Sequence, residues 1–181
     1  MLKRKKNYPI IPFIFLFIIH SSFKESSEYF LNYLYKKSIV NLVLKPGRSQ
    51  NILSSSYSGT LPNKIIVNGK EQNPTSKIVS NNLYSSNNNN IALIWTDSLS
   101  SCANMFNSMT NIISIDMSKF DFSNVNSMDS MFCGCSSLKY INLDNIKTSS
   151  VTSMYNLFKD CSSLTYLNLN FFRWCKKCFK F

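Results

Sequence analysis

A stretch of 26 residues repeats along the second half of the chain. The segment from Met105 to Ser130 aligns without gaps with the segment from Met131 to Asn156, and a partial third copy runs from Leu157 to Phe172. Apolar residues recur in register, and the columns include Met105, Met131 and Leu157; Phe106, Phe132 and Phe158; Ile112, Leu138 and Leu164; and Ile115, Ile141 and Leu167. Such a period predicts a stack of similar units, because one unit of this length cannot bury its own apolar side.

The spacing of the apolar residues changes halfway through each copy. From Leu138 to Leu143 the pattern is L-x-x-I-x-L, which is typical of a strand with one buried face. From Val151 to Cys161 apolar residues follow every three or four positions, as they do on an amphipathic helix. We therefore predict an α/β fold, a short leucine-rich-repeat-type solenoid with one strand and one helix in each 26-residue repeat.

The second copy also carries a motif. The sequence MFCGCSSLKYINLDNIKTSSVTSM, from Met131 to Met154, resembles the BspA-like leucine-rich repeats of surface proteins, and Asp160 to Leu164 repeats its centre. Met109 stands in place of the motif cysteine in the first copy. The resemblance covers residues 91–172, and it implies an exported or surface-displayed protein that contacts other cells or a matrix. It supplies no catalytic residues.

The N-terminus has the organisation of a secretory signal. Four consecutive basic residues, Lys3 to Lys6, precede an apolar stretch from Tyr8 to Ile19. As a helix this stretch would rise about 18 Å, well short of the roughly 30 Å hydrocarbon core of a bilayer. We predict a signal peptide over residues 1–22, cleaved between about Ser21 and Phe23. The alternative is an uncleaved membrane anchor, and in either case membrane contact is limited to this segment.

Residues 23–90 predict a small β-rich N-terminal cap that covers one end of the repeats. Ser38 to Leu44 alternates as a strand, and the segment from Lys64 to Lys70 contains an Asn-Gly pair typical of a tight hairpin. Ser85 to Asn90 is a low-complexity loop, after which Ile91 to Trp95 predicts a strand that leads into the repeats at 91–172. Residues 173–181 form a basic tail that contains cysteine.

Charge and histidine content exclude several kinds of function. The net charge is +11, but residues 91–172 carry four lysines against six aspartates, so the basic groups lie in the flanks. A nucleic-acid-binding face needs basic groups clustered on the folded part, and we therefore predict no nucleic-acid partner. The one histidine, His20, lies in the predicted signal peptide. We predict no cofactor, no metal site and no enzymatic activity.

Six cysteines are present, and export would allow them to pair. Cys135 and Cys161 share one column of the repeat, where stacking would bring their α-carbons to about 5 Å. That separation permits a disulfide, but side chains stacked in parallel often lack the required torsion, and we predict buried free thiols. Cys175 and Cys178 form a C-x-x-C pair with basic neighbours, which supports an alternative function as a thiol-disulfide active protein.

The predicted ligand-binding patch consists of strand residues that point away from the core. It combines two tyrosines with hydroxyl, amide and charged groups; its members are Ser114, Asp116, Lys139, Tyr140, Asn142, Thr165, Tyr166 and Asn168. The leading hypothesis is an exported or cell-surface adhesion module that binds a protein or a glycan of a cell surface or matrix through this patch. Self-association through the exposed last repeat is a further expected contact. Besides the thiol function, the remaining alternative is a truncated, functionless fragment of a longer repeat protein.

Overall fold

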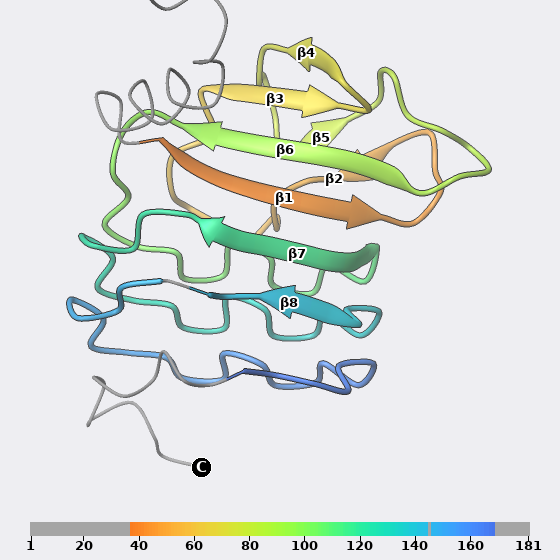
Figure 1. The fold of residues 1–181 in the computed structure, drawn as a ribbon. Coiled ribbons are helices and arrows are strands. Elements are labelled where there is room, and N and C mark those ends of the chain that lie inside the picture. The colour runs from red at the N-terminus through yellow and green to blue at the C-terminus, as the bar shows by residue number, and fades with distance from the viewer. Residues whose placement is uncertain (1–36, 145, 169–181) are drawn as a thin grey trace, which may run out of the picture. The chain divides into compact units, whose positions relative to one another are not determined.

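A computed structural model describes residues 37–144 and 146–168 of the chain. These residues form eight β-strands and no helix (Figure 1). In chain order the strands are β1 (Ser38–Leu44), β2 (Gln50–Asn51), β3 (Lys64–Val67), β4 (Lys70–Gln72), β5 (Ile78–Val79), β6 (Asn89–Trp95), β7 (Ile112–Lys119) and β8 (Tyr140–Asn142).

Six of these strands form one mixed sheet in the order β4-β3-β6-β1-β7-β8. All neighbours are antiparallel except β7 and β8, which run parallel. Strands β2 and β5 form a separate two-stranded sheet. In Figure 1 the repeats continue the large sheet downward from β7, and the other half of each repeat lies behind the strands. The core lies between these two layers.

The strands predicted near the N-terminus are confirmed. Strand β1 spans the predicted residues, and its side chains alternate between buried and more exposed positions, as a strand with one covered face requires. Asn68 and Gly69 connect β3 to β4 with φ angles of 49° and 81°. Two consecutive positive φ angles define the type I′ turn that the Asn-Gly pair predicts.

Strand β1 links the N-terminal region to the repeats, because it pairs with β6 on one side and with β7 on the other. Residues on both sides of position 90 therefore share one sheet and one hydrophobic core. Ile52, Leu53 and Tyr57 are buried, and the backbone N–H of Ser54 donates to the carbonyl of Met105 at 2.9 Å. This segment covers the first repeat, as a cap must. The division of the chain at 22, 90 and 172 stays a prediction.

The helix predicted for the second half of each repeat is wrong, and so is the α/β solenoid of leucine-rich-repeat type with one strand and one helix per repeat. Consecutive tight turns stand in place of the helix. We name these segments coil 1 (residues 102–109), coil 2 (128–135) and coil 3 (154–161). Within coil 2, for example, the N–H groups of Met131, Cys133 and Cys135 each donate to the carbonyl three residues earlier.

Left-handed residues explain why the coils are not helices. Each coil has two positions with positive φ; they are Asn104 and Ser108, Ser130 and Gly134, and Asn156 and Asp160. Four of these six residues are asparagine, aspartate or glycine, which enter this region at low cost, whereas a right-handed α-helix excludes it. In coils 1 and 2 the N–H groups that alternate with the turn-closing ones donate instead to carbonyls of the next copy of the repeat.

The three coils stack with the 26-residue register that the sequence predicts. The rings of Phe106 and Phe132 lie parallel with their centroids 5.9 Å apart, and those of Phe132 and Phe158 lie 5.3 Å apart. The first two rings are 0% exposed, which confirms their predicted burial. Phe158 is half-buried, so the deep burial that the 26-residue period predicts for every ring of this column is wrong for the third ring. Among the described residues Phe132 stacks on two rings, whereas Phe158 stacks on one.

The predicted signal peptide and the basic tail with Cys175 and Cys178 lie outside the described residues. In the part of the chain that the structure describes, no helix is long and apolar enough to cross a membrane.

Candidate functional site

The large sheet has an outer face, opposite the core, on which side chains from neighbouring strands form rows. One row crosses four strands through Asn90, Val43, Ser114 and Tyr140. A second row contains Ile66, Ala92, Asn41, Asp116 and Asn142. Directly paired residues of a sheet point to the same face, and none of these side chains belongs to the buried set, so the rows cover the outer face.

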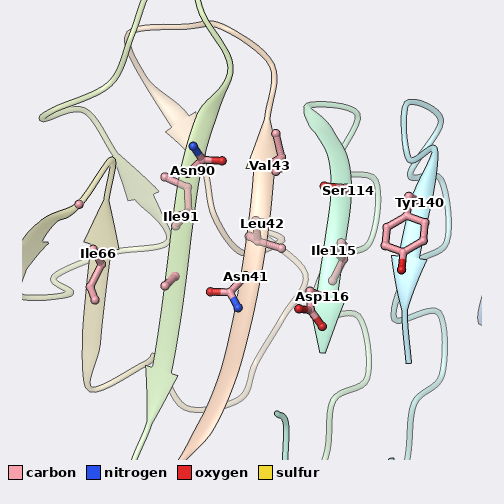
Figure 2. Close-up of a pocket in the computed structure, with 12 residues that line it drawn as sticks. Asn41, Leu42, Val43, Ile66, Asn90, Ile91, Ser114, Ile115, Asp116 and Tyr140 are labelled. Carbon is pink, nitrogen blue, oxygen red and sulfur yellow. The ribbon is translucent and has the colours of Figure 1, made fainter. Parts of the chain in front are cut away.

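A shallow depression of about 230 Å³ lies on this face, over β3, β6, β1, β7 and β8 (Figure 2). Val43, Ile66 and Ala92 supply apolar surface to it. The polar residues that line it are Asn41, Asn90, Ser114 and Asp116. Tyr140 from β8 completes the lining, and its ring projects from the outer face in Figure 2. Its side chain is 53% exposed.

Several polar groups at the depression are available for a ligand. The side-chain amides of Asn41 and Asn90 have no hydrogen-bond partner among the described residues, and the same holds for the hydroxyls of Ser114 and Tyr140. One carboxylate oxygen of Asp116 accepts the N–H of Ser118 at 3.0 Å, which leaves the other oxygen for a further contact. An amide both donates and accepts, so the depression offers both kinds of hydrogen bond.

Three of the eight predicted patch residues meet at this depression, namely Ser114, Asp116 and Tyr140. The other five lie outside it. Lys139 and Thr165 are exposed beside the strand positions, and Tyr166 is 69% exposed one repeat further along the stack. The described residues therefore support a smaller site, displaced toward β1 and β6.

Three of the predicted patch residues, Asp116, Asn142 and Asn168, occupy one column of the repeat and have structural contacts. The side-chain oxygen of Asn142 accepts the N–H of Asp144 at 3.0 Å, just as Asp116 accepts that of Ser118. The amide of Asn168 donates to Asp144 at 3.4 Å. The contacts of Asp116 and Asn142 turn the backbone at the end of the strand, which is a usual role for Asp and Asn, whereas that of Asn168 joins two repeats. These three side chains therefore contribute at least in part to the structure of the repeats.

The sequence interpretation missed the residues that β1, β3 and β6 contribute. Asn41, Val43, Asn90 and Ala92 all occupy alternating strand positions, so their outward direction could have been predicted from the pattern. Their position beside Ser114 and Tyr140 could not, because it depends on β1 lying between β6 and β7.

The described cysteines are free thiols, as predicted for Cys135 and Cys161. The thiol of Cys135 donates to the carbonyl of Phe106 at 3.1 Å, and that of Cys161 donates to the carbonyl of Phe132 at 3.0 Å. Burial raises the pKa of Cys135 to about 12 and that of Cys161 to about 11. Because the thiolate is the reactive form, both groups are poor nucleophiles at neutral pH. Burial also raises the pKa of Cys102.

The described residues contain no group of three or more histidine, cysteine or acidic side chains that could hold a metal ion.

A protein-family model with the description "Mycoplasma protein of unknown function, DUF285" matches residues 76–177, more than half of the chain. No curated protein and no solved structure matches the chain.

Proposed function

We propose that this chain, which belongs to the DUF285 family of Mycoplasma proteins of unknown function, is a non-enzymatic binding module that takes a neutral glycan on the outer sheet face. The observation that carries the proposal is the convergence of unpaired amide and hydroxyl groups beside an exposed tyrosine ring at one depression. Sugars offer hydroxyls that pair with amides, and they offer flat faces that pack on aromatic rings.

The charge at the depression favours a neutral sugar over an acidic one. Asp116 is the one charged side chain among the residues that line it, and its negative charge repels anionic groups. A single carboxylate supports binding rather than glycoside hydrolysis, which in most families uses a pair of carboxyl groups.

Export and surface display are part of the same proposal. The basic N-terminal run before an apolar stretch supports secretion or display at the cell surface, and the MFCGCSSL motif supports kinship with BspA-like surface proteins. Adhesion to a cell surface or matrix is then the activity that the binding site serves. Detection of the full chain, intact from Met1, in the cytosol alone would contradict this part of the proposal.

The test measures binding of short neutral oligosaccharides to the full chain by calorimetry, with acidic oligosaccharides in parallel. We expect Tyr140→Ala and Asn41→Ala each to weaken binding by about tenfold or more. Tyr155→Ala is the matched control, because Tyr155 is 67% exposed on coil 3 and does not line the depression. Far-UV spectra of each variant establish that it folds.

The same variants decide between ligands. A Tyr140→Ala, Tyr166→Ala double variant should keep its fold and lose adhesion to cells or matrix. Wild-type adhesion in this variant, together with a requirement for the lysine-rich flanks, would show that the contact is electrostatic and the site misplaced. Binding to a matrix protein but to no oligosaccharide would overturn the glycan in favour of a protein ligand.

The thiol-disulfide alternative depends on Cys175 and Cys178, which lie outside the described residues. Thiol titration of the secreted chain separates the two functions. Two rapidly reacting, low-pKa thiols would favour the redox function, whereas the binding proposal requires none.

A further inference from the structure

The turn between β3 and β4 carries a pair of residues that can react with each other. Asn68 and Gly69 form the one Asn-Gly pair in the sequence. Glycine has no side chain to shield its backbone nitrogen, so this nitrogen can attack the side-chain carbonyl carbon of a preceding asparagine. Asparagine is accordingly among the thermally labile residues of proteins. The turn places the two reacting groups next to each other, and the surrounding contacts control their reaction.

The attacking nitrogen is free and accessible. The N–H of Gly69 has no hydrogen-bond acceptor among the described residues. A Cβ added to Gly69 would meet nothing within 4 Å, so water can reach the turn. The backbone of the turn is anchored beside it, because the N–H of Asn68 donates to the carbonyl of Asn90 at 2.8 Å.

The side chain of Asn68, in contrast, is held by three hydrogen bonds. Its amide nitrogen donates to the carbonyl of Asn82 at 2.7 Å and to the side-chain oxygen of Asn89 at 2.9 Å. Its oxygen accepts the N–H of Asn90 at 2.9 Å. These bonds attach the turn to the loop of residues 80–88 and to the start of β6, which lie at the same end of the large sheet in Figure 1. Because the amide nitrogen is the leaving group of the reaction, both bonds that it donates must break before it departs.

Asn89 cannot adapt to a change at position 68. Its side chain lies in a residue that is 0% exposed, and its oxygen also accepts the N–H of Tyr84 at 2.6 Å. Its amide nitrogen donates to the carbonyls of Tyr84 at 3.1 Å and Lys45 at 3.4 Å. Exchanging the oxygen and the nitrogen by rotation would oppose the oxygen to these two carbonyls. An acceptor in place of the Asn68 amide would therefore face the oxygen of Asn89 with no proton between them.

We infer that Asn68 is a site of self-modification, at which conversion of the amide to a carboxylate makes an opening of the 80–88 loop permanent. The backbone nitrogen of Gly69 forms a bond to Cγ of Asn68, and the bond from Cγ to Nδ2 breaks. Ammonia leaves and takes up the proton of the Gly69 N–H. Water then adds to one of the two carbonyl carbons of the succinimide ring and opens it, which gives aspartate or isoaspartate. The reaction needs water and no other reactant.

The aspartate product loses contacts on one side only. A carboxylate at position 68 has no N–H to donate, so the carbonyl of Asn82 and the oxygen of Asn89 lose their donor. The carboxylate still accepts the N–H of Asn90. The loop is therefore released from the turn, whereas β6 keeps its place in the sheet. This inference concerns the loop alone and does not depend on a glycan ligand.

Incubation of the full chain at mildly alkaline pH, followed by peptide mapping with mass spectrometry, tests the modification. We expect Asn68 to be converted before any other described asparagine, because no other is followed by glycine. A synthetic peptide of residues 63–74 should react at least about tenfold faster than the folded chain, because its amide is not held. Urea below the unfolding transition should speed the reaction in the chain. Equal rates in chain and peptide, earlier conversion of another asparagine, or no reaction of Asn68 even in urea overturns the inference.

An Asn68→Asp variant tests the consequence, with hydrogen exchange read at single amides of the full chain. The N–H of Tyr84 donates to Asn89 inside the loop contact and should exchange at least about tenfold faster than in the parent chain. The N–H of Asn90 should change by less than about twofold, because the carboxylate still accepts it. The chain converted by incubation should show the same pattern, so the test does not depend on the folding of the variant.

Asn63→Asp is the matched control. The side-chain oxygen of Asn63 accepts the N–H of Thr96 at 2.8 Å, and its amide nitrogen donates to no described group, so this substitution removes no hydrogen bond. Exchange at Tyr84 should stay as it is in the parent chain. Unchanged exchange at Tyr84 in Asn68→Asp, or equal acceleration in the control, would show that the Asn68 amide does not hold the loop and overturns the inference.

Discussion

Coils 2 and 3 follow the same sequence pattern, but they differ in their neighbours. Coil 2 lies between two other coils, and its Phe132 and Cys135 are 0% exposed. In coil 3 the equivalent Phe158 and Cys161 are half-buried. The strands that follow the coils shorten in the same order, from eight residues in β7 to three in β8, and no strand is assigned from 164 to 168. The same turns thus form in all three coils, whereas the burial of the shared columns and the length of the paired strands decrease along the described part of the stack.

The largest expected difference between the two coils is in the cost of removing a phenylalanine. Phe132→Ala should lower the free energy of unfolding by about 3–5 kcal/mol, because a fully buried ring stacked between two others leaves a cavity. Phe158→Ala should cost only about 1–2 kcal/mol, because this ring has one stacking partner and is partly exposed. Urea denaturation of the two variants measures both values.

The comparison of these two variants controls for the chemistry of the substitution, since both remove the same ring from the same column. Equal costs would show that coil 3 is as well covered as coil 2. An unchanged stability in Phe132→Ala would contradict the stacked arrangement itself.

A smaller difference is expected at the second left-handed position of each coil. Gly134 has a φ of 71°, and an added Cβ would lie 3.3 Å from the Cα of Ser108 in coil 1. Gly134→Ala should therefore cost about 1–2 kcal/mol, through strain and crowding together. Asp160 occupies the equivalent position of coil 3 with φ 59° and is exposed, so Asp160→Gly should change stability by less than about 0.5 kcal/mol. Thermal melts of both variants measure the difference, and a cost of Gly134→Ala no larger than that of Asp160→Gly would argue against close stacking of coils 1 and 2.

The apolar columns, the stacking register and several strands could be predicted from the sequence. They follow from local alternation, from the Asn68-Gly69 turn and from the 26-residue period. The conformation of the coils could not be predicted in the same way, because apolar residues every three or four positions fit both a helix and a run of tight turns. The choice depends on hydrogen bonds to residues about 25 positions away, such as Phe132 to Leu157. The polar residues at the left-handed positions were the available indication, and the helix prediction did not weigh them.

The residues of the candidate site also fall into those that the sequence could predict and those that it could not. Ser114, Asp116 and Tyr140 could be predicted because they belong to the repeats, where register alone brings neighbouring copies together. Asn41 and Asn90 join them through antiparallel pairings between segments far apart in the chain. Hydrophobic alternation gives the direction of each side chain but not the order of the strands, so this half of the depression required the structure.

The smallest expected effect is on the loss of stability at alkaline pH, and it again compares coil 2 with coil 3. Burial raises the pKa of Cys135 from its ordinary value of 9.0 to about 12, and that of Cys161 to about 11. A thiol that is protonated in the folded state but ionised in the unfolded chain contributes stability that is complete below pH 9.0, and this stability is lost as the pH rises toward the folded pKa. The melting temperature should therefore fall above about pH 9.

Cys135→Ala should reduce this decline more than Cys161→Ala does, because burial raises the pKa of Cys135 further than that of Cys161. Melts from pH 7 to pH 11 in a reducing buffer test the order, and a decline that is identical in both variants and in the parent chain would show that neither thiol is its source.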